Sequence, residues 1–230
     1  MSMPKRAEAL LLDALGTLVA LEPPAPRLRA ELAARFGLAI SAAEAERAIA
    51  AEIAYYRAHL DDGRDRAALA GLRDRCTEAL RGALPRSPDL DLIEAAALRD
   101  ALLTSLRFVP FADARPALVA ARAAGRRLVV VSNWDVSLHG VLEGLGLAAL
   151  VDGILTSAEA GSRKPAAGIF ERALELAGTT AARAVHAGDS VEEDVAGALA
   201  AGIEPVLVSR DGTPGPQGVR TIAVLTELFR

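Results

Sequence analysis

Short apolar runs alternate with helical segments over the second half of the sequence, and this alternation constrains the fold more than any other feature. Each apolar run is too short for a helix and ends in polar or turn residues, as a buried strand does. Parallel strands need long crossover connections, so the pattern predicts a parallel sheet with helices on both faces. The predicted strands are RRLVVVS (126–132), VDGILTS (151–157), RAVHAGD (183–189) and EPVLVS (204–209).

One more strand is predicted near the start, at EALLLD (8–13), and a long helical region follows it. From Pro26 to about Arg107 the chain is rich in Ala, Leu, Arg and Glu and shows no strand-like alternation. Ser41 and Glu44 form a capping-box pattern at the start of one of about four helices. We therefore expect an α/β protein with a doubly wound parallel sheet. Residues 1–20 and 108–230 would form the core, and residues 21–107 an inserted all-helical subdomain.

The charge and cysteine content exclude several classes of protein. A net charge of −4 over 230 residues gives no general affinity for nucleic acid or for an anionic membrane. The single cysteine, Cys76, rules out an intrachain disulfide and fits a reducing compartment. Glu8 and Asp13 interrupt the apolar run near the start, and no stretch approaches the roughly 18 uncharged apolar residues of a membrane span. We expect a cytoplasmic protein, and the sequence does not indicate its oligomeric state.

Three of the predicted strands end in polar side chains that could carry chemistry: Asp13, the pair Ser132 and Asn133, and Asp189. Ligands of open parallel sheets bind outside the carboxyl ends of the strands, so these groups should meet at one edge. Two carboxylates with water and phosphate oxygens suit Mg²⁺, and a carboxylate can attack a phosphoryl group. Lys164 would add a positive charge near the developing negative charge, while Ser132 and Asn133 would donate hydrogen bonds to phosphate oxygens.

Four segments resemble, in order, the motifs of the haloacid dehalogenase-like (HAD) hydrolase superfamily: DALGTL, SNW, RKP and GDSVEEDVAGALAAG. The helical insert lies where that superfamily has its type 1 cap. The resemblance implies that Asp13 is the nucleophile and that Ser132 and Lys164 bind the transferred group. It also implies Mg²⁺ on Asp13, on the backbone carbonyl of Leu15 and on Asp189. Asp194, together with Glu193, would support the metal site from behind these ligands.

Leu15 departs from the phosphatase pattern, because phosphatases of this superfamily usually carry a second aspartate at that position. That aspartate protonates the leaving oxygen, and positioned acid–base catalysis is worth about 10²- to 10⁴-fold in rate. A backbone carbonyl can still bind the metal whatever the side chain. The sequence therefore predicts a site that binds Mg²⁺ and phosphate but lacks its usual proton carrier.

Three interpretations of Leu15 stay open. The one we favour is a Mg²⁺-dependent phosphatase-type hydrolase of a small phosphorylated substrate that is slow or acts on an activated phosphate, unless an acid such as Glu22, Asp61 or Asp62 replaces the missing aspartate. The second is a catalytically impaired protein that binds a ligand or partner. The third is a 2-haloacid dehalogenase, whose halide leaves without a proton. Against the third, Asp189 and Asp194 are acids that a metal-independent dehalogenase does not need.

Overall fold

A computed structural model describes residues 7–229 of the chain. The chain forms two compact units. Among the described residues, one unit consists of residues 7–20 and 109–229, and the other spans Leu21–Phe108. Strands β2 (Val19–Leu21) and β3 (Phe108–Pro110) lie at the two connections between the units and pair with each other.

The first unit, called the core unit below, contains a six-stranded sheet in the order β5-β4-β1-β6-β7-β8. Every neighbouring pair is parallel, which confirms the predicted doubly wound α/β class. Strand β1 lies near the centre of the sheet, between β4 and β6. The strands are β1 (Ala9–Leu12), β4 (Arg127–Ser132), β5 (Gly153–Thr156), β6 (Ala184–Gly188), β7 (Glu204–Val208) and β8 (Arg220–Ile222).

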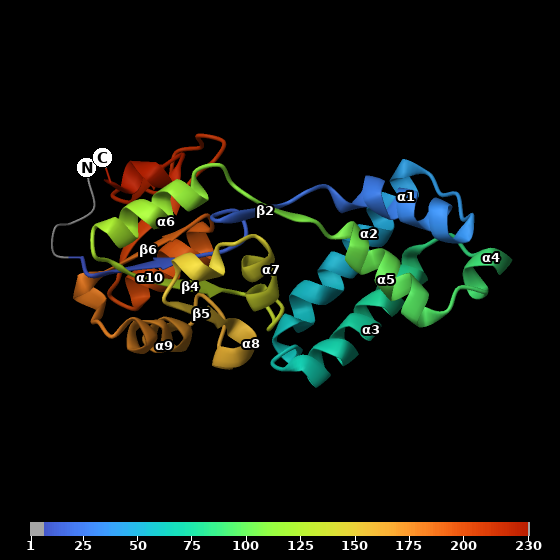
Figure 1. Cartoon of the computed structure of the whole chain (residues 1–230), viewed down its shortest axis with the longest axis horizontal. Coiled ribbons are helices and arrows are strands. Elements are labelled where there is room, and N and C mark those ends of the chain that lie inside the picture. The colour runs from blue at the N-terminus through green and yellow to red at the C-terminus, as the bar shows by residue number, and fades with distance from the viewer. Residues whose placement is uncertain (1–6, 230) are drawn as a thin grey trace. The chain divides into compact units, whose positions relative to one another are not determined.

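Helices cover both faces of this sheet. Leu11, Val129 and Val131 point to the face covered by α9 and pack around the fully buried Phe170. Successive side chains of a strand point to opposite faces, so Leu10 and Val130 face the other side, where α6 lies (Figure 1). The helices of the core unit are α6 (Ala114–Ala123), α7 (Leu138–Gly144), α8 (Ser157–Ala160), α9 (Ala167–Ala177) and α10 (Gly197–Ala200).

The second unit is helical, as its composition and its lack of strand-like alternation predict. Leu28, Leu32, Leu80 and Leu98 belong to its own apolar core, which is separate from that of the sheet. The predicted capping box is confirmed, because the Ser41 hydroxyl accepts from the Glu44 backbone N–H and the Glu44 carboxylate accepts from the Ser41 N–H. The helices are α1 (Pro24–Phe36), α2 (Ala42–His59), α3 (Arg66–Ala83), α4 (Pro88–Asp91) and α5 (Ala95–Ser105).

Four elements differ from the expectation. Strands β2, β3 and β8 have three residues each, too few to show an alternating pattern in a sequence. The segment Val191–Ala196 lies in one of the helical stretches between the predicted strands, but it is a π-helical turn that continues into α10 rather than a regular α-helix. π-Turns are often found at functional sites, and this one carries Asp194.

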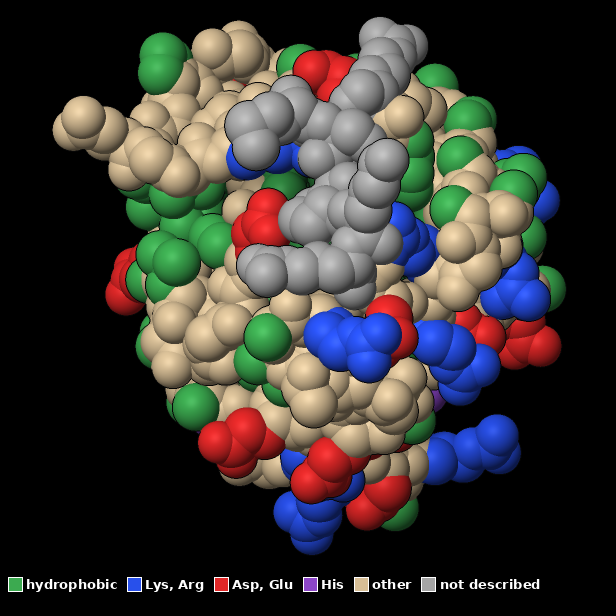
Figure 2. Space-filling model, turned by 90° about the vertical axis from the view of Figure 1, so that its left-hand side faces the viewer, with side chains coloured by type: hydrophobic (Ala, Val, Ile, Leu, Met, Phe, Trp, Pro, Cys, Tyr) green, Lys and Arg blue, Asp and Glu red, His purple; other side chains and the backbone are tan. Residues whose placement is uncertain are grey.

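One face of the molecule is drawn as a space-filling view in Figure 2, and it carries charges of both signs. On the face drawn in Figure 2, Lys and Arg side chains lie among Asp and Glu side chains rather than in a field of one sign. Within residues 7–229 no helix is long and apolar enough to cross a membrane.

Because Phe170 is packed against the sheet, its truncation should greatly reduce the stability of the protein. Its ring is 0% exposed, so Phe170→Ala should lower the free energy of unfolding by about 3–5 kcal/mol through lost contacts and a residual cavity. Val119→Ala on α6 is the control, because Val119 is 50% exposed and its truncation should change stability by about 0.5 kcal/mol or less. Urea unfolding followed by circular dichroism measures both, and similar costs for the two variants would contradict the packing described here.

Candidate active site

Three neighbouring strands bring their polar ends together at one edge of the sheet. Asp13 follows β1, Ser132 ends β4 and Asp189 follows β6. Because β1 lies between β4 and β6 in register, with Leu12 opposite Val130 and Ala187, the residues that follow each strand are neighbours. The Asp13 N–H donates to the Ala187 carbonyl at 3.0 Å, which continues the ladder up to the carboxylate. The sheet therefore places these side chains together although they are far apart in the sequence.

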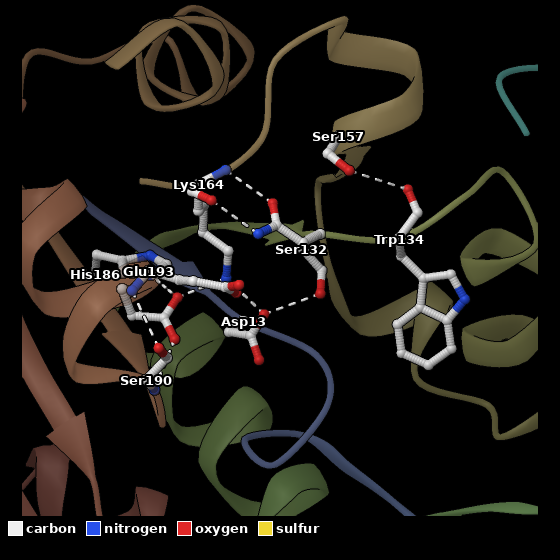
Figure 3. A network of polar contacts seen from close by, with 10 residues as sticks. Asp13, Ser132, Trp134, Ser157, Lys164, His186, Ser190 and Glu193 are labelled. Carbon is white, nitrogen blue, oxygen red and sulfur yellow. Dashed lines mark hydrogen bonds and ion pairs between the residues drawn. The ribbon is translucent and has the colours of Figure 1, made fainter. Parts of the chain in front are cut away.

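Lys164 connects the acids at the centre of this edge. Its side chain is only 1% exposed, and its ammonium donates to Asp13 Oδ1 at 2.6 Å and to Asp194 Oδ1 at 2.5 Å (Figure 3). The Ser132 hydroxyl donates to the same Asp13 oxygen at 2.9 Å. Both donors therefore bind Asp13 Oδ1, and neither of them binds Oδ2.

Asn133 holds the segment that carries Lys164. Its side-chain amide donates to the Lys164 carbonyl at 2.9 Å and accepts from the Lys164 N–H at 2.8 Å. The amide also hydrogen-bonds to Glu193. In this structure the Asn133 amide therefore holds the lysine segment, and hydrogen bonding from Asn133 to phosphate stays a prediction.

Asp194 is held by three donors. Lys164 and His186 donate to its Oδ1, the His186 Nε2 atom at 2.8 Å, and the Ser190 N–H donates to Oδ2 at 3.0 Å. Since a carboxylate only accepts, His186 carries its proton on Nε2 in this contact. A Cβ atom at Gly188 would lie 2.1 Å from the Asp194 Cγ atom, so only glycine lets the carboxylate approach the strand end.

Three carboxylates could hold a metal ion at this edge. Oxygens of Asp13, Asp189 and Asp194 all lie within 4.8 Å of one another. The Gly16 turn after β1 closes on the same place, because a Cβ atom at Gly16 would lie 2.2 Å from Asp189 Oδ2. Fully ionised, three carboxylates and one ammonium leave two negative charges, which a divalent cation would balance. The donor set, all oxygen, fits a hard cation.

The charges of the site oppose one another in their effects on pKa. Burial raises the pKa of Asp13 despite the neighbouring Lys164. Burial also disfavours ionisation of Asp194, but the Lys164 charge and the His186 hydrogen bond outweigh it and hold the pKa of Asp194 below its usual range. Desolvation, then the charges of Asp13 and Asp194, raise the pKa of Asp189 to about 7. The cluster therefore has excess negative charge that ionisation of Asp189 would increase.

The remaining predicted residues are placed as follows. Leu15 is 38% exposed, unusual for a leucine, and lies directly between Ala14 and the Gly16 turn. Glu22 pairs with Arg27 and Arg107, and Asp62 pairs with Arg75, all inside the helical unit. A role for these acids in catalysis stays a prediction.

His186 is a site residue that the sequence did not reveal. A histidine in an apolar strand is more often part of the core, and His186 is indeed fully buried, with its ring edge-on to Phe170. Its position three residues before Asp189 was the available signal. Strand and π-turn together direct its Nε2 atom to Asp194, which no local pattern predicts.

Comparison with known proteins agrees with this geometry. The sequence profile of a family described as "Hydrolase: haloacid dehalogenase-like hydrolase" matches residues 7–202. That is most of the 230 residues, and the chain belongs to the haloacid dehalogenase-like hydrolase family.

Individual relatives match over part of their length. Haloacid dehalogenase-like hydrolase domain-containing protein 3 of Bos taurus is 46% identical over 88 residues, which are 38% of this chain and 35% of the relative. Ribulose-1,5-bisphosphate 5-phosphatase of Halopiger xanaduensis is 38% identical over 119 residues, 50% and 49% of the two chains. Glyceraldehyde 3-phosphate phosphatase of Methanothermobacter thermautotrophicus is 35% identical over 110 residues, 45% and 46%. The chain thus spans about a third to a half of the length of these relatives.

Solved structures share the fold over nearly the whole chain. A defluorinating L-2-haloacid dehalogenase has a TM-score of 0.73 at 22% identity and covers 99% of this chain and 97% of its own. A HAD phosphatase from Thermococcus onnurineus has a TM-score of 0.65 at 23% identity, with 96% and 95% covered. At such identities the likeness shows the fold alone.

The pKa of Asp189 predicts a pH-dependent stability. Its carboxyl titrates near 3.8 when unperturbed and near 7 when folded, so the folded state binds this proton more tightly. The resulting stabilisation is full at low pH and is lost as pH rises from about 4 to about 7. Without metal, Asp189→Asn should therefore be more stable than wild type at about pH 8 and equal to it at about pH 4.

Melting temperatures measured with a chelator at both pH values test this expectation. After allowance for solvent screening of an exposed side chain, the gain at about pH 8 should be about 1 kcal/mol, or about 2–4 °C. Millimolar Mg²⁺ should raise the melting temperature of wild type more than that of Asp189→Asn. Glu175→Gln, at an exposed carboxylate of α9, is the control and should show neither effect. An equal shift at both pH values for Asp189→Asn would show that charge repulsion is not its cause.

Proposed function

We propose that this protein is a Mg²⁺-dependent phosphohydrolase in which Asp13 is the nucleophile. The observation that carries the proposal is the arrangement around Asp13. Ser132 and Lys164 hold one oxygen of a buried carboxylate, and Asp189 and Asp194 lie beside it with oxygens that could share a cation. Two of the relatives are named as phosphatases of small phosphorylated compounds, which supports the same substrate class for this chain.

Mg²⁺ would be held by Asp13, Asp189 and the carbonyl of Leu15, with Asp194 behind them. When bound, it neutralises the repulsion between the carboxylates and the phosphate and orients the phosphoryl group. When Asp13, Asp189, Asp194 and Lys164 are all ionised, they carry two net negative charges. The two positive charges of Mg²⁺ would balance them.

Asp13 Oδ2, the oxygen not engaged by Ser132 or Lys164, would attack phosphorus. The bond from phosphorus to the leaving oxygen breaks, and that oxygen departs with the electron pair. An aspartyl-phosphate results, and attack by water on its phosphorus then releases phosphate and restores the carboxylate. The Lys164 ammonium, whose pKa is raised by the adjacent charges of Asp13 and Asp194 against the effect of burial, stays protonated throughout. It would stabilise the negative charge that develops on the transferred group.

Leu15 limits the leaving group. The aspartate that usually stands at this position would protonate the leaving oxygen, and an aliphatic side chain cannot. An oxygen that leaves without a proton must be a stable anion, as in an acyl or aryl phosphate. We therefore propose that the substrate is an activated phosphate, or that hydrolysis of ordinary esters is slow.

A panel of phosphate esters, acyl phosphates and 2-haloacids, tested with Mg²⁺ and with a chelator, separates the candidate functions. Metal-dependent phosphate release, greater for acyl and aryl phosphates than for alkyl esters and abolished in Asp13→Asn, is expected. Metal-independent halide release would instead identify a dehalogenase. No turnover of any compound, with Mg²⁺ still bound, would identify a binding protein on this fold.

Leu15→Asp tests the missing proton carrier directly. Restoring the acid should raise kcat for alkyl phosphate esters by about 10²-fold or more and should change acyl phosphate turnover far less. Leu15→Asn is the matched control, because it has the same shape and polarity but cannot donate an acidic proton. Equal gains in the two variants would point to polarity or access rather than acid catalysis, and no gain in either would mean that Leu15 is not the limiting residue.

A further inference from the structure

Arg210 lies at the same edge of the sheet as the candidate active site, in the loop after β7. Its guanidinium donates to two backbone carbonyls of the turn that follows Asp13, to Thr17 at 2.5 Å and to Gly16 at 3.3 Å. The side chain is 21% exposed, so the contact is largely shielded from water. Nothing in the sequence pattern pointed to this arginine, which lies beyond all four HAD-like motifs.

The other side of the guanidinium is anchored to the segment that follows β3. Arg210 Nη1 donates to both carboxylate oxygens of Asp113, at 2.8 and 2.9 Å, and the guanidinium lies 3.8 Å from the centre of the Phe111 ring. Asp113 is held in turn, because its Oδ2 accepts from the Leu225 N–H at 2.5 Å. A cation fixed by a carboxylate pair and an aromatic ring can hold flexible carbonyls in place.

The turn that Arg210 contacts, residues Ala14–Val19, sets the distance between two of the site's acids. It starts at the residue after Asp13, and Gly16 lies so close that a Cβ atom there would touch the Asp189 carboxylate. Gly16 also has φ +84°, a conformation that glycine adopts readily and that external contacts must select. A shift of this turn would therefore move the Leu15 carbonyl and the space left for Asp189 together.

We propose that Arg210 is a positioning residue that holds the Ala14–Val19 turn in the geometry the reaction requires. The effect on rate rests on the phosphohydrolase function proposed above, whereas the effect on the turn does not. Only arginine fits the position, because four acceptors in two directions need the planar fork of donors that a lysine ammonium lacks. Arg210 would touch neither substrate nor metal and would act through the backbone.

Kinetics of Arg210→Lys test the catalytic consequence. With the acyl phosphate that wild type turns over best, kcat should fall about 10- to 100-fold, because misplacing a catalytic group by about 1 Å has an effect of that size. KM should change by less than about threefold, since the turn is proposed to position reacting groups rather than bind the remote substrate. Asp113→Asn, which weakens the anchor but keeps its shape, should shift kcat in the same direction by a smaller factor.

Arg127→Lys is the matched control. Arg127 starts β4, at the opposite edge of the sheet, and forms an ion pair with Asp152 at 3.2 Å. It carries the same substitution away from the turn, so its kcat should equal that of wild type. In an Arg210→Ala variant, methylguanidinium should restore part of the lost kcat, and methylammonium at equal ionic strength should not. Equal kcat in Arg210→Lys and Arg127→Lys would overturn the catalytic part of the proposal.

Hydrogen exchange of the peptide that covers Ala14–Val19 gives a readout that needs no activity. The Gly16 N–H donates to the Val19 carbonyl at 2.8 Å, and the Leu18 and Val19 N–H groups donate to the Ala14 carbonyl at 2.8 and 2.9 Å. These amides should exchange about tenfold faster in Arg210→Lys than in Arg127→Lys, well below the melting temperature of either. Unchanged exchange would overturn the proposal even if wild type proves active. Faster exchange in a protein without phosphatase activity would support the positioning role and reject only the proposed reaction.

Discussion

The buried ammonium of Lys164 is the interaction on which the rest of the site depends. An unpaired charge inside a protein is strongly unfavourable, and removal of one partner from a buried ion pair typically costs about 3–5 kcal/mol. Here Asp13 and Asp194 both bind the ammonium, so the three groups must be placed together or not at all. The contacts of Asn133 with the lysine segment and of His186 with Asp194 stabilise that placement further. The carboxylate of Asp13, the proposed nucleophile, is therefore held by the same ion pair that offsets the cost of its burial.

Two glycines, which have no side chain, impose the second constraint at this edge of the sheet. Gly188 leaves room for Asp194, and Gly16 leaves room for Asp189, each at a distance where a single methyl group would collide with a carboxylate. Desolvation, and then the repulsion between these crowded acids, raises the pKa of Asp189 to about 7. A divalent cation is the natural complement of such a cluster. The stability lost by crowding the acids is what metal binding would recover.

Electrostatics and proton transfer are separated in this chain. In the proposed function the carboxylates and the lysine would bind and stabilise a phosphoryl group, while Leu15 presents an exposed aliphatic side chain where phosphatases of the superfamily usually have an acid. The fold does not resolve the consequence, since both a phosphatase and a dehalogenase share it at 23% and 22% identity. In the proposed function, the substrate class depends instead on which leaving groups can depart without a proton. That is a property of single side chains.

The sequence by itself determined the fold class and most of the acids, because strand and helix periodicity and the residues that end each strand are local features. The parallel sheet, the helical insert and the strand-end acids Asp13 and Asp189 could be predicted in this way, whereas Lys164, which ends no strand, was singled out in the RKP motif. Only the tertiary structure decided that Asn133 binds the Lys164 backbone, that His186 turns toward Asp194 and that Arg210 reaches Thr17. The Asn133 contact joins residues 31 positions apart in the sequence, and the Arg210 contact joins residues 193 positions apart. Such contacts depend on how strands are ordered and turns are packed, and no pattern within a short window carries that information.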